Sequence, residues 1–324
     1  MLALPHVGDW LSSHLQCALH SIQSMLSAHA VTKYNHPIAL WILFAACGVT
    51  ELCISFTFCT PIECIRPLTR WEKRNPIAPD ILYAFFVRIV LFPLIAFFEY
   101  DWLHRHIAGT LSDLGFAQPS FAALVPALQT WPVITFALNF VILDLADYWR
   151  HRLSHRLGWW YGVHSLHHAE DQMTFWSDDR SHILEDAITY VWLIAVGLAI
   201  GVPSLQFPFL ILTFRLLGSV SHANTTIGYG WLGNHILVSP RFHRTHHALK
   251  AAGRRSCNYG TALSLWDVAF GTARFNDDTV ETGDAGAEPA LVHGSWVEQQ
   301  RAGFRRMMRL ARRKRSSVTT RSAA

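Results

Sequence analysis

Charged residues are scarce in this chain of 324 residues, at 15% against about one-quarter in an ordinary soluble domain. Its six cysteines form no C-x-x-C pair, which indicates free thiols in a reducing compartment or in a bilayer. The first residues lack a basic stretch followed by a compact apolar run, so we expect no cleavable signal peptide. These absences argue against an ordinary soluble domain and against a disulfide framework.

Hydrophobic residues are abundant instead. They make up 51% of the chain, with thirteen tryptophans and twenty phenylalanines, which indicates a membrane protein. Residues 37–58, 81–100 and 120–143 are apolar segments that we predict to cross the bilayer, although Arg88 interrupts the second. Two shorter apolar runs are split by Pro203, and we predict a helical hairpin over residues 187–218 that enters and leaves on one side.

Positive charge orients these predicted spans. The loop at 59–80 carries Arg66, Arg70, Lys73 and Arg74, and the most basic stretch is the C-terminal "RAGFRRMMRLARRKR". By the positive-inside rule, both regions and the region after the third span lie on the cytoplasmic side. A basic tail can bind nucleic acid, but beside several apolar segments it favours a membrane-facing tail and no nucleic-acid partner.

Histidine is concentrated between His151 and His247, where eleven of the nineteen lie. His151 and His155 form H-x-x-x-H, and H-x-x-H-H occurs twice, in "HSLHH" and "HRTHH". On a helix, residues three and four apart share a face, so each pattern can direct two or three imidazoles at one point. One metal ion needs three or four imidazole ligands, so we predict two ions, with the first patterns forming one half of the site and "FHRTHH" much of the other. The predicted metal ligands are His151, His155, His164, His167, His168, His182, His222, His243, His246 and His247.

Four polar residues are candidate catalytic residues that support these ligands: Asp144, Asp147, Asn258 and Asp267. A ligating imidazole commonly donates its second N–H to a carboxylate or carbonyl group. Asp147 lies one helical turn before His151, so we expect its carboxylate to reach that ring or a neighbouring ligand. Alternatively, the first two form a charge pair at the helix end, and the other two supply turn or cap chemistry.

These patterns predict an all-α fold: a polytopic membrane helical bundle with a cytoplasmic helical cap that holds a histidine-rich dimetal site. We divide the chain into four regions. They are an interfacial segment at 1–35, transmembrane helices at 36–143, a histidine-rich catalytic region with the hairpin at 144–275, and a polar loop with a basic tail at 276–324.

The stretches "DYWRHRLSH", "HSLHH", "SHAN", "SPRFHRTHH" and "NYGTALSLWDVAFGT" together resemble the fatty acid hydroxylase and sterol desaturase superfamily of membrane proteins. The match runs from about Asp144 to Thr272, and the three boxes in order are specific where one alone is weak. The resemblance implies metal ligation by the eight box histidines and by His222. His182 matches a family position usually written R-x-H-P-x-E, but Ile183 replaces the proline, so His182 is either a ligand or a supporting residue.

The resemblance implies an O2-dependent oxidoreductase that hydroxylates or desaturates a lipid at two iron ions. No haem or flavin motif is visible, so we expect electrons from a separate donor protein or reductase. Histidine sites also accept zinc readily, so purified protein can carry that ion instead. Two alternatives remain: a zinc-dependent membrane hydrolase, for which Glu170 and Asp171 are the nearest acids after the second box, and a non-catalytic metal-binding membrane protein. The sequence does not name the lipid.

Overall fold

The computed structural model describes residues 37–70, 77–95, 102–116, 120, 124–125, 131–203, 206–249, 256–275 and 281–321. The chain divides into a unit of residues 1–43 and a unit of residues 44–324, and the elements below belong to the second except for residues 37–43 of the first helix. The predicted interfacial segment at 1–35 lies outside the described residues. Within the described ranges the chain forms helices and two isolated β-bridges, which confirms the predicted all-α class.

Three helical stretches are long and apolar enough to cross a membrane: Phe44–Ile65, Ala78–Ile95 and Pro132–Arg156. The first lies within α3 (Pro37–Ile65), and the third is α8. α8 begins at Pro132 instead of residue 120, because proline fits the first turn of a helix, where its missing N–H has no partner to lose. The same helix continues through the first histidine pattern, so a candidate span and part of the site share one rigid element.

The second stretch is divided into α4 (Ala78–Phe85), η1 (Phe86–Leu91) and α5 (Phe92–Ile95). η1 is a π-helical segment, a rare geometry that is often found at functional sites. It contains Arg88, whose side chain is only 1% exposed and forms ion pairs with three acids. A charged residue in an apolar helix is costly unless it is paired inside the bundle, and this pairing explains why the predicted interruption is tolerated.

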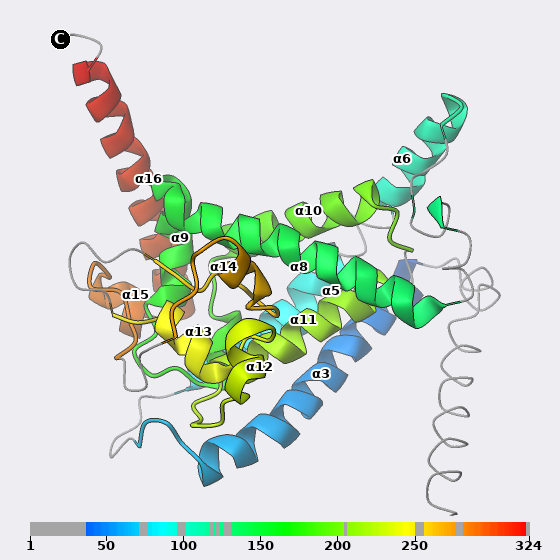
Figure 1. The fold of residues 1–324 in the computed structure, drawn as a ribbon. Helices are drawn as coiled ribbons and strands as arrows, with labels where there is room; N and C mark the ends of the chain where they lie inside the picture. The colour runs from blue at the N-terminus through cyan, green and yellow to red at the C-terminus, as the bar shows by residue number, and fades with distance from the viewer. Residues whose placement is uncertain are drawn as a thin grey trace, which may run out of the picture. The chain divides into compact units, whose positions relative to one another are not determined.

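The predicted hairpin is formed by α10 (Ile183–Ala199) and α11 (Phe207–His222). α10 packs against α8 and α9 (Gly158–His168), whereas α11 packs against the 3-10 helix η4 (Phe175–Asp179) and α13 (Pro240–His246). In Figure 1, α11 runs beside the short helix α13, and α14 (Leu265–Ala269) lies beside α8. The hairpin therefore lies next to helices that carry all three histidine patterns.

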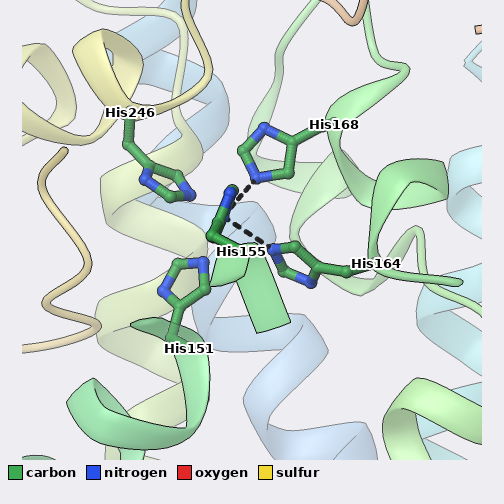
Figure 2. A group of neighbouring side chains, drawn as sticks. All are labelled: His151, His155, His164, His168 and His246. Atoms are coloured by element: carbon green, nitrogen blue, oxygen red, sulfur yellow. Dashed lines mark hydrogen bonds between the residues drawn. The ribbon is translucent and has the colours of Figure 1, made fainter. Parts of the chain in front are cut away.

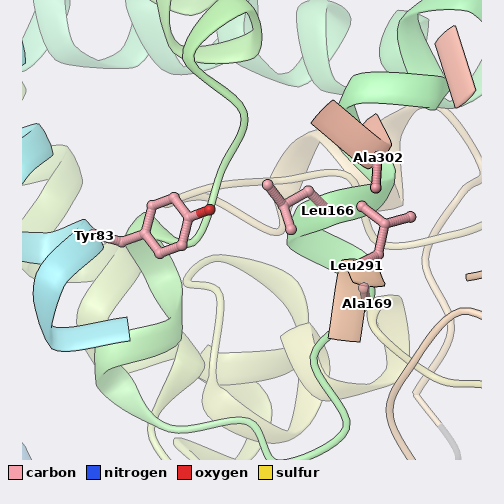
Figure 3. Close-up of a cluster of buried hydrophobic side chains, with 5 residues drawn as sticks. All are labelled: Tyr83, Leu166, Ala169, Leu291 and Ala302. Atoms are coloured by element: carbon pink, nitrogen blue, oxygen red, sulfur yellow. The ribbon is translucent and has the colours of Figure 1, made fainter. Parts of the chain in front are cut away.

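Much of the region predicted as a polar loop and basic tail is helical, in α15 (Pro289–His293) and α16 (Trp296–Arg321). α16 packs closely along α9, because Gly162 has no Cβ to meet the backbone of Met307; a Cβ there would lie 2.3 Å from the Met307 Cα. Figure 3 shows the buried apolar cluster at this junction, formed by Tyr83, Leu166, Ala169, Leu291 and Ala302. The C-terminal helix thus supports the helix that carries the second histidine pattern.

The remaining described helices are α6 (Trp102–Asp113) and α12 (Gly230–His235). Gly228, Gly230 and Gly233, at the start of α12, have the G-x-G-x-x-G spacing of dinucleotide-binding loops. That motif requires a preceding strand, and here the glycines follow helix α11. The spacing therefore carries no dinucleotide site.

Candidate metal centre

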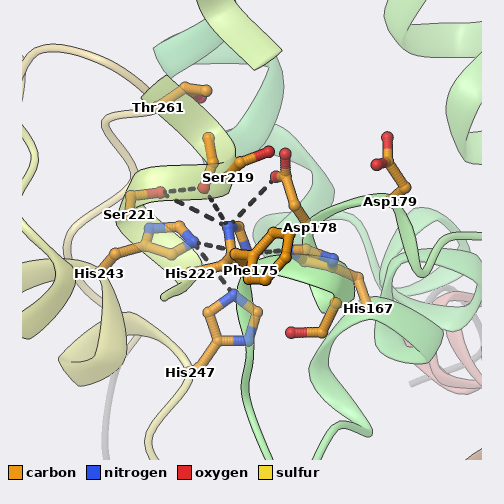
Figure 4. Close-up of polar contacts among 12 residues, drawn as sticks. His167, Phe175, Asp178, Asp179, Ser219, Ser221, His222, His243, His247 and Thr261 are labelled. Carbon is orange, nitrogen blue, oxygen red and sulfur yellow. Dashed lines mark hydrogen bonds and ion pairs between the residues drawn. The ribbon is translucent and has the colours of Figure 1, made fainter. Parts of the chain in front are cut away.

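Nine histidines form two neighbouring groups in which the ring nitrogens available for a metal lie within 4.8 Å of one another. The five-histidine group contains His151, His155, His164, His168 and His246, whose rings converge on one point in Figure 2. The four-histidine group contains His167, His222, His243 and His247, which Figure 4 shows with their polar neighbours. The rings of His168 and His247 stack with centroids 4.4 Å apart, so the two groups adjoin.

Each H-x-x-H-H pattern is divided between the two groups. On α9, His164 and His168 belong to the five-histidine group and His167 to the other; at α13, His243 and His247 belong to the four-histidine group and His246 to the other. Successive helical residues are rotated by about 100°, so positions i and i+4 are nearly aligned while i+3 points to one side. The prediction that the patterns form separate halves is therefore wrong, since each H-x-x-H-H pattern contributes to both groups.

The spacing of the ring nitrogens fits metal ligation. Neighbouring Nε2 atoms lie 3.1 to 3.2 Å apart within each group. Metal–nitrogen bonds of about 2.0–2.1 Å place adjacent ligands roughly 3.0–3.4 Å apart. In each group the rings are therefore already arranged around a space of the size that one ion requires.

His151 and His246 of the five-histidine group each present a buried Nε2 atom that has no hydrogen-bond partner. His151 Nδ1 lies 2.8 Å from the Tyr259 carbonyl oxygen, and His246 Nδ1 lies 2.7 Å from the Cys257 carbonyl oxygen. A carbonyl oxygen only accepts, so each Nδ1 carries the proton and each Nε2 presents a lone pair. Both Nε2 atoms are buried without a partner in the structure, and a metal ion is the group that would satisfy them.

Asn258 shapes the backbone that supplies these two carbonyl groups. Its φ of 57° lies in the left-handed region, which asparagine tolerates better than most residues. Its side-chain amide donates to the carbonyls of Phe242 and Arg274 at 2.8 and 2.9 Å and accepts from the Arg274 N–H at 2.7 Å. This turn directs the carbonyl group before Asn258, that of Cys257, to His246. It directs the carbonyl group after Asn258, that of Tyr259, to His151.

Asp267 and Asp144 hold the segment that follows this turn. Asp267 accepts hydrogen bonds from the N–H groups of Tyr259 and Gly260 at 2.8 and 2.7 Å. Asp144 accepts from the N–H groups of Ala262 and Leu263 and from the Trp266 indole at 2.8 to 3.1 Å. Both carboxylates are fully buried, and neither makes a described contact with a histidine. The alternative of turn chemistry, left open for Asp267, agrees with this geometry, and it extends to Asp144.

Asp147 does not reach His151, contrary to our expectation. Its carboxylate lies 2.5 Å from Arg150 Nε and 2.5 Å from the Thr261 hydroxyl. The second N–H of His151 goes to a backbone carbonyl instead, so the helical spacing alone misassigned the partner. Any effect of Asp147 on the histidines is therefore indirect and passes through Arg150.

Two carboxylates that face histidines of these groups were not predicted from the sequence. Glu185 Oε1 lies 3.2 Å from His164 Nδ1 in the five-histidine group, and Asp178 Oδ1 lies 3.2 Å from His222 Nδ1 in the four-histidine group. The glutamate of the R-x-H-P-x-E element was a signal for Glu185, whereas no spacing rule identifies Asp178. Such partners fix the orientation and tautomer of a ligating ring.

A buried arginine holds each of these two carboxylates. Arg150 Nη1 lies 2.9 Å from Glu185, and Arg88 Nη2 lies 3.2 Å from Asp178. Each arginine also pairs with further acids: Arg150 with Asp147, and Arg88 with Asp179 and with Glu51 of α3, the latter at 2.8 Å. The two groups are therefore supported by the same device, an acid–arginine–acid chain that ends on a histidine.

His182 lies outside both groups. Its Nδ1 accepts the N–H of Leu184 at 3.1 Å, which caps α10, and its Nε2 lies 2.9 Å from the carbonyl oxygen of Gln300 on α16. Both ring nitrogens have protein partners, so this geometry does not support the predicted metal ligation. It agrees with the supporting role that the sequence left open.

Burial sets the protonation of the histidines outside the candidate spans. It lowers the pKa of His243 to about 3 and holds the pKa values of His167, His168, His246 and His247 well below the ordinary value, because a charged imidazole is poorly solvated there and faces other imidazoles. Burial opposes ionisation of Glu185, but His164 and Arg150 outweigh it and lower the pKa of this carboxyl. Neutral imidazoles beside an ionised carboxylate suit metal binding.

A cavity of about 170 Å³ opens from the histidines toward the hairpin. Histidines of both groups line one end, and Leu193, Ile211 and Phe214 of α10 and α11 line another part. Charged and polar side chains, including Arg215 and Tyr190, lie along it. The cavity therefore connects the histidine groups with the apolar side chains of the hairpin.

Residues 136–272 match the family model for fatty acid hydroxylases. This region of the chain is similar to the fatty acid hydroxylase family. An ornithine lipid hydroxylase of Rhizobium tropici is 29% identical over 225 residues, which cover 60% of this chain and 66% of the relative. Human alkylglycerol monooxygenase is 29% identical over 153 residues, or 46% of this chain and 33% of the relative. A Delta(7)-sterol 5(6)-desaturase of Gibberella zeae is 27% identical over 148 residues, or 45% and 43%.

The fatty acid hydroxylase match covers the three histidine patterns and the turn at Asn258, and it confirms the resemblance seen in the sequence. The chain spans between one-third and about two-thirds of the length of these three relatives. No solved structure matches the chain.

Proposed function

We propose that this chain is a membrane oxidoreductase that uses O2 to hydroxylate or desaturate a lipid at two irons bound by nine histidines. The observation that carries the proposal is the pair of adjoining all-histidine groups, each spaced for one ion, in a region that matches the fatty acid hydroxylase family. Soluble di-iron bundles bind their metals through glutamates as well as histidines. Here the described carboxylates, Glu185 and Asp178, face the outer nitrogens of ligand rings instead.

The irons would supply O2 activation and hydrogen abstraction from a lipid carbon, with electrons from a separate donor protein. The chain's own part is to hold the rings in place and to keep water out. His151 and His246 are fixed by carbonyl groups, and His164 and His222 face carboxylates. His246 and His247 are at most 1% exposed, so the site is closed to bulk solvent on their side.

A lipid substrate is supported by the three candidate spans and by the apolar wall of the cavity. The relatives are named for an ornithine lipid, an alkylglycerol and a sterol, which also indicates a lipid for this chain. The cytoplasmic orientation of the site rests on the positive-inside rule. Reporter fusions after residues 75 and 320 should agree, and a fusion after residue 110 should report the opposite side.

Lipid mass spectrometry of cells with and without the gene tests the proposal. We expect one lipid class to gain an oxygen atom or lose two hydrogen atoms in air, and no such change without oxygen or in the His243→Ala variant. A product that forms equally well without O2 would favour a hydrolase and overturn the oxygenase proposal. An unchanged lipid profile in air, with metal-loaded protein in the membrane, would also contradict it.

A further inference from the structure

The lining of the cavity changes character along the hairpin. On α11, Arg215 lies seven residues before His222, which is two helical turns or about 10 Å along the axis. Ile211 lies a further turn away from the histidines. On α10, which runs in the opposite direction, Tyr190 and Leu193 follow Glu185 at increasing distance along the helix from the site. From the histidines outward, the cavity is therefore lined first by charged side chains, then by Arg215 and Tyr190, and last by apolar side chains.

Arg215 has a weakly paired donor at this boundary. The side chain is about nine-tenths buried, and its Nη2 donates to the Tyr190 hydroxyl. Its Nη1 forms only a long ion pair with Glu51, at 3.6 Å, and no hydrogen bond. Glu51 is closer to Arg88, at 2.8 Å. A buried guanidinium N–H with so weak a partner can still donate to an acceptor from outside the chain.

We propose that Arg215, supported by Tyr190, binds an oxygen atom in the polar end of the lipid substrate. This inference rests on the proposed function and adds a substrate class: lipids whose reacting carbon lies near a carboxylate, phosphate, ester or amide oxygen. The alkyl part lies against Leu193, Ile211 and Phe214, so the polar end faces the histidines. Oxidation therefore falls close to the polar end of the lipid and not at the far end of its alkyl chain.

The reaction at that carbon balances with O2 and the electron donor already named. In hydroxylation, one C–H bond breaks and one C–O bond forms, so the substrate carbon is oxidised. O2 is reduced with two further electrons from the donor protein, and its second oxygen atom leaves as water with two protons. Arg215 takes no part in these steps and acts only on the position of the substrate.

The test uses the full chain in detergent with an iron–sulfur electron donor and its reductase, and three lipids of equal chain length. One has an ionised carboxylate head, an N-acyl amino acid; one has a neutral head, a monoalkylglycerol; and one, an n-alkane, has no polar end. Tandem mass spectrometry locates the added oxygen or double bond. We expect modification within a few carbons of the polar end of one or both headed lipids and no turnover of the alkane.

The variants separate binding from folding. Arg215→Gln should raise KM by roughly 10–100-fold, the usual loss for a hydrogen bond to a charged group, with kcat and metal content little changed. Arg215→Lys should restore binding of the carboxylate lipid more than of the neutral one if the acceptor is anionic. Tyr190→Phe removes only the supporting hydroxyl and should give a smaller rise in KM. Arg305→Gln on α16, at a side chain that is 59% exposed, is the matched control and should change nothing.

Modification at the far end of the chain, or turnover of the alkane as fast as of the headed lipids, would overturn the inference while leaving the oxygenase proposal intact. Loss of metal in Arg215→Gln without a change in KM would also overturn it, since the residue would then be structural. Failure of every lipid to give an O2-dependent product would instead overturn the proposed function itself.

Discussion

The two histidine groups are supported by similar chains of charge that come from different parts of the molecule. In the five-histidine group, Arg150 lies on the same helix as His151 and holds Glu185 of the neighbouring α10. In the four-histidine group, Asp178 is held by Arg88 of the second candidate span, which also binds Glu51 of the first. The first group depends on α8, which itself carries histidines, and on the neighbouring α10, whereas the second depends on helices of the first two candidate spans, which carry none.

This difference suggests why Arg88 stands in an otherwise apolar helix. Gly218 allows the same connection, because a Cβ at that position would lie 2.8 Å from the carboxylate oxygens of Asp178. Substitutions in the first two candidate spans should therefore affect the four-histidine group and spare the other. The predictions below compare matched positions in the two groups.

The largest effect is expected for the ligands themselves. His246→Ala in the five-histidine group and His243→Ala in the four-histidine group each remove one metal–nitrogen bond. Each should lower lipid oxidation by more than about 100-fold, which exceeds the usual loss when a residue that contacts only a ligand ring is removed. Product formation per folded chain in membranes is the measurement. Retention of a tenth of wild-type activity in either variant would show that its group is not needed for catalysis.

Removing the carboxylate partner should have an intermediate effect. Glu185→Gln and Asp178→Asn keep the shape of each side chain but remove the charge that faces His164 or His222. We expect activity or metal affinity to fall about 10–100-fold in both. Glu185→Gln should weaken metal binding in the five-histidine group and Asp178→Asn in the four-histidine group, which iron Mössbauer spectra can distinguish. Identical spectral changes in the two variants would contradict the assignment of Glu185 to the five-histidine group and of Asp178 to the four-histidine group.

Asp147 and Glu51, the acids that contact the arginines and not the histidines, should matter less for activity. Asp147→Asn and Glu51→Gln each leave the arginine with at least one remaining carboxylate, so we expect activity to fall by less than about 10-fold, below the range for a direct partner. Asp147→Asn should act on the five-histidine group and Glu51→Gln on the other. An effect of Asp147→Asn as large as that of Glu185→Gln would mean that Asp147 contacts a ligand directly when metal is bound.

The smallest effect concerns the metal-free protein. The pKa of His243 is lowered to about 3, and those of His246 and His247 are also lowered, while unfolded imidazoles titrate near about 6.5. Between these values the unfolded chain binds more protons, so the free energy of unfolding should fall as the pH drops below about 6.5. Thermal unfolding of chelator-treated protein from about pH 7.5 to about pH 5.5 measures this. The His243→Gln and His247→Gln double variant should show a shallower pH dependence, and an equal slope would argue against buried neutral rings.

Much of the fold follows from the sequence, because apolar length predicts helices directly. The three spans and the hairpin appear near their predicted positions. α16 was not predicted, since its sequence is strongly basic and only the tertiary structure shows that Ala302 is buried against α9. The start of α8 at Pro132 also depended on local proline chemistry that hydropathy does not register.

The site was predicted in part. Nine of the ten predicted ligands fall in the two groups, because repeated histidine spacing is a strong local signal. His182 does not, since its match was to a family position and not to a spacing. Three features of the site depend on which helices meet: the division of each H-x-x-H-H pattern between two groups, the carbonyls around Asn258, and the partner Asp178. Spacing along one helix cannot reveal them.

The most direct test of the account is the number of metal ions per chain, measured as iron plus zinc on protein purified gently from membranes. Two adjoining groups predict about two ions for the wild type, in line with one ion per set of three or four ligands. They predict about one ion for the His243→Ala and His247→Ala double variant, with the five-histidine group still loaded. A reproducible value near one ion in fully active wild-type protein would contradict the account.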